Sequence, residues 1–262
     1  MPKASLRDWL LVNRTYICNM KDVFNAPSGE GGFEEGQVLL INKPLGWTSF
    51  DAVRKIRNLV QTRKVGHAGT LDPLATGLLI ICTVKFTKKI NEYMAQEKEY
   101  SGSITLGATT STYDLESEPE DFKPVETISE NEIRSATKNF TGEIMQVPPV
   151  HSAIKIKGKR MYKLARAGKE VNPEPRKIFI KEFDIIKIDW IAIGSTVVHF
   201  RVVCSTGTYI RSLANDFGAA LGCGGYLSSL CRTRIGEFSL NDAMTIDSFE
   251  EKIKRPSPNH SA

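Results

Sequence analysis

Hydrophobic and polar positions become regular from about residue 38, after residues 1–36, which are mixed in character and end in the glycine-rich segment SGEGGFEEG. Residues 38–41 form a short apolar run typical of a buried strand. Thr48 follows as a hydroxyl N-cap, and the pattern after it predicts a helix. Four apolar residues share one face of that helix: Phe50, Val53, Ile56 and Val60.

Later segments alternate between strand and helix patterns. Strands are predicted over residues 78–82, 98–106, 176–188 and 196–204. Helices are predicted over 129–140, where Ser129 and Glu132 form a capping-box pattern, over 159–167, and over 208–221. The chain therefore reads as an α+β domain built on a central, largely antiparallel mixed sheet flanked by helices and loops.

Composition excludes several classes of protein. Of the 262 residues, 41% are hydrophobic and 25% charged, and no apolar run reaches the ~18 residues of a membrane span. The N-terminus lacks a signal-peptide pattern, so we expect a cytoplasmic protein. Five cysteines and four histidines show no C-x-x-C pair and no ligand spacing. We therefore expect no disulfide framework and no metal.

Charge is unevenly distributed along the chain. The net charge is +5, and residues 155–169 hold seven Lys or Arg and no acid. Residues 113–132 hold eight acids and one Lys. From the pattern alone the basic stretch is as compatible with a solvated face as with an anionic partner.

The segment 66–77, GHAGTLDPLATG, is the densest in turn residues. It holds three glycines and a proline in twelve residues, which predicts a loop between the helix and the strand at 78–82. Loops held by rigid elements often carry functional sites. Locally, Asp72 before Pro73 is more typical of a turn than of a functional site, and no phosphate-loop pattern is present.

Six segments in order resemble the TruB family of pseudouridine synthases, and together they span about 38–238. They are INKPLGWTSFDAVRKIR, GHAGTLDPLATGLL, KEYSGSITLGATTSTYD, VPPVHSAIKIKGKRMYKLARAG, STGTYIRSLANDFGAAL and LSSLCRTRIGEF. The resemblance implies the pseudouridine synthase fold. It also implies isomerisation of uridine to pseudouridine at position 55 of the tRNA T-loop, by base flipping and without a cofactor.

The resemblance assigns the chemistry to a few residues. Asp72 matches the catalytic aspartate, and a carboxylate can bond to or stabilise an electrophilic carbon. Arg211 matches the arginine that pairs with it and favours its ionised form. Tyr100 and Tyr209 match the two active-site tyrosines. The sequence leaves open whether Asp72 attacks the ring or acts at the sugar through a glycal.

Other residues are assigned to substrate binding by the same resemblance. Leu230 matches an apolar residue of the pocket, and His67 matches a histidine that fills the space left by extruded bases. An insertion over about 147–172 corresponds to the segment that grips the T-stem and loop. Its basic residues are expected to contact phosphates: Lys155, Lys157, Lys159 and Arg160. Lys43 and Pro44 match an early Lys-Pro motif that we interpret as support for the site.

The organisation along the chain follows. We expect a flexible extension over 1–36, a catalytic domain over 37–238 and a short C-terminal tail over 239–262, with no full C-terminal PUA domain. The expected partner is tRNA, with no membrane and no obligate protein partner, and the chain is expected to be a monomer. Val84 stands where a glycine is common in the family, so a positive φ there would strain its β-branched side chain.

Two alternatives stay open. The chain could belong to the branch of pseudouridine synthases that works through guide RNAs, although the TTSTYD and VPPVHSAIK segments favour the stand-alone enzyme. It could also act as a chaperone that binds and remodels tRNA. That role would survive loss of the Asp72 carboxylate.

Overall fold

A computed structural model describes residues 33–254 except 153, 157, 162, 163, 165, 166, 169, 170 and 192–194. Most of the expected N-terminal extension, Lys157 and the last eight residues of the expected tail therefore lie outside the described residues. Within the described part, no helix is both long and apolar enough to cross a membrane.

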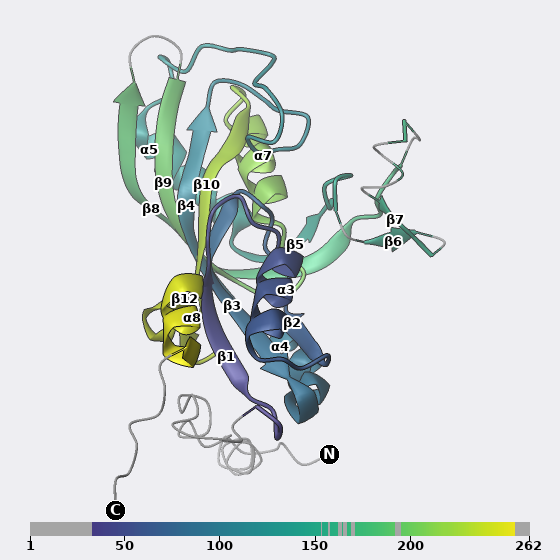
Figure 1. Cartoon of the computed structure of the whole chain (residues 1–262). Helices are drawn as coiled ribbons and strands as arrows, with labels where there is room; N and C mark the ends of the chain where they lie inside the picture. The colour runs from purple at the N-terminus through teal and green to yellow at the C-terminus, as the bar shows by residue number, and fades with distance from the viewer. Residues whose placement is uncertain are drawn as a thin grey trace, which may run out of the picture.

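One ten-stranded mixed sheet organises the domain (Figure 1). Its main path runs in the order β12 (Met244–Thr245), β1 (Val38–Lys43), β3 (Ala75–Thr83), β10 (Gly225–Ile235), β4 (Lys98–Leu106), β9 (Ser195–Cys204), β8 (Arg176–Ile191) and β5 (Gly142–Gln146). β2 (Val65–Ala68) pairs with β3, and β11 (Phe238–Ser239) pairs with β10. The β1–β12 and β3–β10 pairs are parallel and the others antiparallel, which confirms the predicted sheet type.

The sheet consists of two halves joined where β3 meets β10. That joint comprises three residue pairs, Leu230–Ala75, Cys231–Thr76 and Arg232–Gly77. Gly77 has φ +101°, and a Cβ there would lie 2.4 Å from the carbonyl oxygen of Arg232. Glycine is thus required for the two strands to approach this closely.

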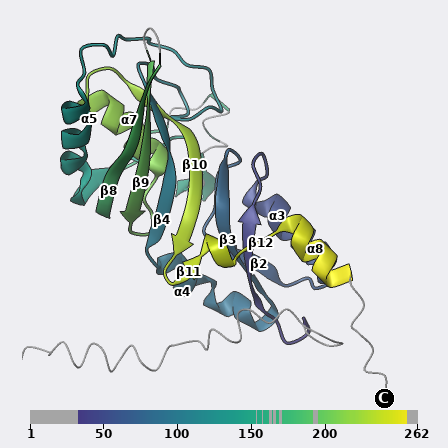
Figure 2. The same cartoon turned by 90° about the vertical axis from the view of Figure 1, so that its left-hand side faces the viewer.

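Helices cover the two halves separately (Figure 2). α5 (Glu130–Ala136) and α7 (Ile210–Ala220) cover one face of the larger half, where Phe217 of α7 packs on Phe183, and Phe183 packs on Phe200. α3 (Ser49–Leu59) and α8 (Ile246–Lys254) pack on β1 and β3. α4 (Ile90–Ala95), preceded by the 3-10 helix η2 (Val84–Lys89), packs on the opposite face of the same strands.

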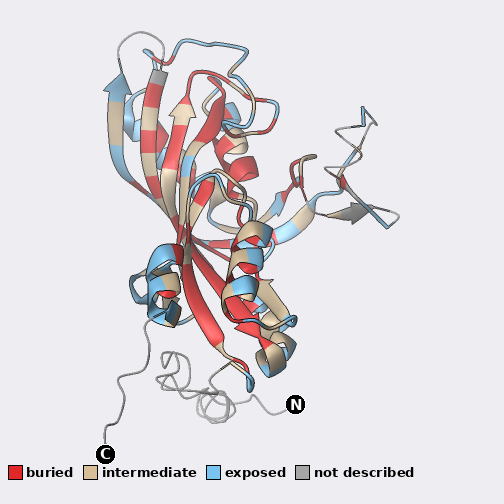
Figure 3. Ribbon diagram, viewed as in Figure 1, coloured by how far each residue is buried: buried red, intermediate tan, exposed pale blue. Residues whose placement is uncertain are grey.

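Burial follows this arrangement (Figure 3): the strands at the centre of the sheet and α7 are mostly buried, while the outer surfaces of α3 and α8 are open. The predicted capping box is present at Ser129–Glu132 before α5, and the predicted N-cap Thr48 forms a second capping box with Asp51 before α3. The predicted apolar face of α3 is wrong at Phe50, which is 59% exposed. Ser49 and Ala52 take the inward positions beside Val53 and Ile56.

Four sequence expectations differ from the structure. The predicted loop at 66–77 shrinks to 69–74, because residues 66–68 belong to β2, which pairs with residues 80–83 of β3, and residues 75–77 already belong to β3. Residues 159–160 begin as strand β7 (Lys159–Arg160), paired with β6 (Lys155–Ile156), and not as a helix. β10 lies at the centre of the sheet although its mixed polar sequence gave no strand signal.

The fourth difference concerns the expected C-terminal tail. Residues 239–254 contribute β12 and α8, and the α8 residue Phe249 is fully buried against Phe33, with ring centroids 6.3 Å apart. This part of the tail therefore belongs to the packed domain.

Val84 adopts φ +44°. This β-branched residue, which stands where a glycine is common in the family, is therefore strained. Its N–H donates to the carbonyl oxygen of Lys64 at 2.8 Å, and its own carbonyl accepts from Thr87 Oγ1 at 2.7 Å. These bonds hold a β-branched residue in the left-handed region.

Candidate active site

The loop 69–74 carries Asp72 and is fixed from two sides. Ser49, at the start of α3, accepts from the Leu71 N–H at 2.8 Å and donates to the Leu71 carbonyl at 3.1 Å. Gly46 N–H donates to the Pro73 carbonyl at 2.9 Å. The backbone on both sides of Asp72 is thus held to the segment that follows β1.

Lys43, at the end of β1, also contacts this loop. Its side chain is fully buried, and Nζ donates to the carbonyl oxygens of Pro44, Trp47 and Pro73, at 3.0, 2.5 and 3.4 Å. Burial lowers the pKa of the Lys43 ammonium to about 8, although Asp72 opposes this shift. Lys43 therefore has the supporting geometry expected of the Lys-Pro motif.

Arg211 reaches the loop from the first turn of α7. Gln146, at the end of β5, fixes the start of that helix by bonding the Tyr209 N–H at 2.8 Å and the Tyr209 carbonyl at 3.0 Å. The Arg211 side chain is 4% exposed and donates to the carbonyls of Thr112 and His151, both at 3.1 Å. These bonds leave Nε to face carboxylates.

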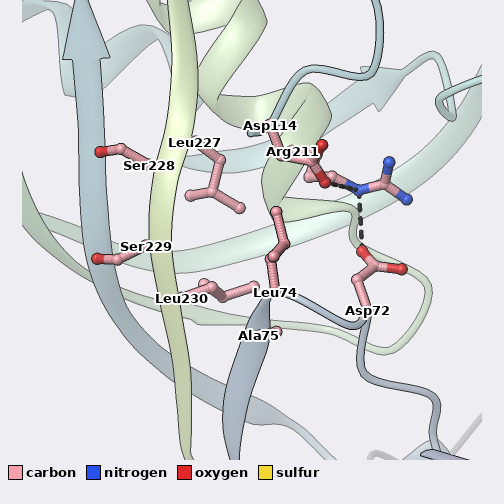
Figure 4. A pocket seen from close by; sticks show the side chains of 9 residues that line it. All are labelled: Asp72, Leu74, Ala75, Asp114, Arg211, Leu227, Ser228, Ser229 and Leu230. Carbon is pink, nitrogen blue, oxygen red and sulfur yellow. Dashed lines mark ion pairs between the residues drawn. The ribbon is translucent and has the colours of Figure 1, made fainter. Parts of the chain in front are cut away.

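Two carboxylates share this guanidinium (Figure 4). Arg211 Nε lies 2.9 Å from Asp72 Oδ2 and 3.5 Å from Asp114 Oδ2. Asp114 is buried, and its other oxygen accepts from Thr112 Oγ1 at 2.7 Å and from the Glu116 N–H at 3.0 Å. Asp114 is thus fixed on every side, whereas 39% of the Asp72 side chain stays open.

Burial among these groups raises the pKa of Asp72 above its usual range. Arg211 and Lys43 lower that pKa, and the like charge of Asp114 raises it. Asp72 is therefore an oriented carboxylate whose ionisation depends on its neighbours, the property expected of a reactive acid.

A cavity of about 270 Å³ opens beside Asp72. Five of the residues selected from sequence line it, drawn from four different segments of the chain: Asp72, Tyr100, Tyr209, Arg211 and Leu230. A second, smaller recess of about 20 Å³ continues from Asp72 between Leu74, Leu227 and Leu230 (Figure 4). The site is apolar on one side and charged on the other, which suits a flat base with polar edges.

Tyr100 and Arg232 form the inner wall. They are direct cross-strand partners on β4 and β10, and they are 8% and 1% exposed. Burial raises the pKa of that phenol, and Arg232 opposes the shift.

Other residues selected from sequence lie elsewhere. His67 is on β2, not among the residues that line the cavity; burial lowers its pKa, and a hydrogen bond to the Gly69 backbone opposes this. Lys159 is exposed in the β6–β7 hairpin, which projects away from the sheet. The backbones of Lys155 and Arg160 belong to the same hairpin, while Lys157 lies outside the described residues.

Sequence reasoning missed three charged residues of the site. They are Asp114, Arg232 and Lys98, of which Lys98 is 5% exposed, lines the cavity and donates to the carbonyls of Met94 and Gln96. All three belong to the motif segments. What distinguishes them is the burial of their charged side chains, which is unusual in proteins and is visible only in the structure.

The arrangement provides an oriented carboxylate, aromatic walls and buried hydrogen-bond donors. Among residues 33–254, as far as they are described, no group of three His, Cys, Asp or Glu side chains could hold a metal ion. A carboxylate of this kind can act directly on an electrophilic carbon of a bound base or sugar.

Comparison with known proteins identifies relatives. The model of the TruB family pseudouridylate synthase N-terminal domain matches residues 57–210, and that of the tRNA pseudouridylate synthase B C-terminal domain matches residues 211–259. The chain is 52% identical over 227 residues to the tRNA pseudouridine synthase B of Flavobacterium johnsoniae, covering 84% of this chain and 97% of that protein. The corresponding protein of Parabacteroides distasonis is 47% identical over 229 residues, covering 85% and 95%.

Solved structures show the same fold. A Cbf5–Nop10–Gar1 complex contains a chain with TM-score 0.64 and 29% identity, covering 87% of this chain and 58% of that one. An H/ACA ribonucleoprotein bound to a substrate RNA containing 2'-deoxyuridine gives TM-score 0.61 and 27% identity, with coverage of 83% and 53%. On the family models and the sequence identities, the chain belongs to the TruB family of pseudouridine synthases.

Proposed function

We propose that this chain isomerises uridine to pseudouridine at position 55 in the T-loop of tRNA, with Asp72 as the catalytic carboxylate. The reaction breaks the N1–C1′ bond, turns the base and rejoins it through C5. The observation that carries the proposal is the Asp72–Arg211 ion pair at 2.9 Å on the wall of a cavity lined by Tyr100, Tyr209 and Leu230.

The cavity accounts for the choice of base. Tyr100 and Leu230 offer apolar faces on which a flat pyrimidine can stack, and backbone and side-chain groups around Tyr209 offer polar contacts at its edge. A base enters such a cavity after it has left the helical stack, at a cost of a few kcal/mol.

Binding of the T-stem is assigned to the β6–β7 hairpin. Lys159 is exposed there, in the stretch 155–169 that holds seven basic residues. Contacts of this kind position RNA through its phosphates and carry no sequence information by themselves. The chain acts as a monomer in this proposal, since one copy supplies every residue of the cavity.

The alternatives predict different substrates and different responses to mutation. A guide-dependent enzyme requires a guide RNA, whereas the proposed enzyme modifies free tRNA transcripts. A chaperone acts equally well without the Asp72 carboxylate.

The test uses a T-loop transcript carrying tritium at uridine C5, with release of tritium counted under single turnover. We expect release by the wild type without guide RNA, and no release by Asp72→Asn, which should still bind the transcript. Glu118→Gln, at an exposed position of the same acidic segment, serves as an acidic control and should retain release. Tight binding without release by the wild type would overturn the enzymatic proposal, and release that requires a guide would favour the guided branch.

A further inference from the structure

Arg232 is the largest side chain of the fully buried set, and the reaction as proposed gives it no part. It comes from β10, at the joint between the two half-sheets, and lines the cavity that holds Asp72. A buried charge is stable when it is paired or when its donors are satisfied. Among the described residues no carboxylate pairs with Arg232, so its donors must be satisfied in another way.

Two separate parts of the site accept from them. Nε donates to the Leu78 carbonyl of β3 at 2.8 Å, and Nη2 donates to the Gly69 carbonyl at 3.1 Å, where the loop that carries Asp72 begins. The same side chain faces Tyr100, its direct cross-strand partner on β4, and lowers the pKa of that phenol. The planar guanidinium has a fixed set of donors, so it holds the two carbonyls in one fixed relation beside the Tyr100 side chain.

Gly69 gives an independent indication of how tightly this contact is fitted. Its φ is +91°, and a Cβ there would lie 3.4 Å from Arg232 Nη1. The start of the loop thus passes directly over the guanidinium. A shift of Arg232 would move both the loop and the Tyr100 ring.

We propose that Arg232 is a positioning residue, which sets the separation between the Asp72 carboxylate and the Tyr100 ring on either side of the bound uracil. This inference rests on the proposed function and adds that alignment for the chemical step depends on β10 as well as on the loop. Misplacement of reacting groups by about 1 Å can cost about 100-fold in rate.

A nearby arginine on the same strand provides a matched control. β10 has a bulge between Arg232 and Arg234, so Arg232 faces Tyr100 while Arg234 lies opposite Glu99. The Arg234 side chain is 30% exposed and pairs with Glu97 at 2.9 Å. It carries the same charge two residues away without touching the cavity.

The experiment measures the single-turnover rate of tritium release and the tRNA Kd of Arg232→Gln, Arg232→Lys and Arg234→Gln. We expect Arg232→Gln to lose about 100-fold in rate with a Kd within about threefold of the wild type. Arg232→Lys should recover part of the rate, because an ammonium can still donate to some of the acceptors. Arg234→Gln should keep the wild-type rate.

A second measurement separates positioning from general support of the fold. In a Tyr100→Phe background the hydroxyl is absent, so Arg232→Gln should cost clearly less than it does in the wild type, as expected for coupled groups. Thermal unfolding shows which variants fold. If Arg232→Gln does not fold, Arg232→Lys is compared in the wild-type and Tyr100→Phe backgrounds in its place.

Equal losses in both backgrounds, or a loss confined to Kd, would overturn the positioning role. Because the wild type is measured in the same assay, failure of this inference is distinguishable from failure of the proposed function, in which the wild type itself would release no tritium.

Discussion

Asp72 and Asp114 depend on one guanidinium, so the charge of each affects the other. Asp114 raises the pKa of Asp72, which is already raised by burial. If Asp72 reacts as a carboxylate, the rate must fall as the pH drops through this raised pKa, above the ordinary value of about 3.9.

Replacing Asp114 by Asn removes the like charge and should lower the pKa of Asp72. The acid limb of the single-turnover rate against pH then moves to lower pH, whatever the change in maximal rate. Asp121→Asn, an exposed position in the same acidic segment, should leave the limb in place. An acid limb that moves upward in Asp114→Asn would contradict this account.

Val84 permits a test of backbone strain without touching the site. At an ordinary position glycine is less stable than alanine by about 0.5–1 kcal/mol. At φ +44° alanine carries a strain of about 1–2 kcal/mol that glycine does not. We therefore expect Val84→Gly to be more stable than Val84→Ala by about 1 kcal/mol in urea unfolding. If the alanine variant were the more stable of the two, position 84 would be unstrained.

Among single residues, sequence reasoning succeeded where a motif was involved and failed where burial decides. Asp72 and Arg211 were paired through a family resemblance, and the structure places them in contact. Asp114 and Arg232 escaped selection because nothing in a linear sequence tells that a charged residue in a turn or a strand will be almost fully enclosed.

Among secondary-structure elements, regular apolar patterns and caps gave correct predictions. β4 was predicted over residues 98–106 and spans Lys98–Leu106, and both predicted N-caps, Thr48 and Ser129, start helices. β10 was missed because it is mixed in character: Ser228 and Ser229 bond Ser103 on the face away from Asp72, while Leu227 and Leu230 face the site (Figure 4). A bulge between Leu227 and Ser229 also breaks its alternation.

α8 offers a test at this scale, because its sequence was read as part of a tail. Phe249→Ala should cost about 3–5 kcal/mol of unfolding free energy, since the ring is fully buried. Phe50→Ala removes the same side chain at a position that is 59% exposed and should change stability by less than about 0.5 kcal/mol. Equal effects in urea unfolding would show that α8 does not pack as described.

For the molecule as a whole, charge is separated along the chain and in space. The acidic segment connects β4 to α5, while the first residues of the basic stretch form the β6–β7 hairpin, which projects on its own (Figure 1). The composition predicted two charged regions. Composition could not predict that the basic region would project from the domain, because this depends on the path of the chain after β5.

This separation predicts where salt acts. Lys159→Glu should weaken tRNA binding, and the slope of log Kd against log salt should fall by about one unit. The single-turnover rate at saturating enzyme should stay unchanged, because Lys159 is not among the residues that line the cavity. Lys123→Glu in the acidic segment is the control; a larger effect there would place the RNA on the other side of the molecule.

The narrow joint between β3 and β10 has a mechanical meaning. Three residue pairs join β3 to β10, and the residues that line the cavity are divided between the two half-sheets, with Asp72 beside β3 and Tyr100 on β4. The relative orientation of the two half-sheets therefore sets the separation of these two side chains. A substitution far from the cavity that changed this orientation would act on the site through the joint, so the stiffness of the joint matters as well as the identity of the lining residues.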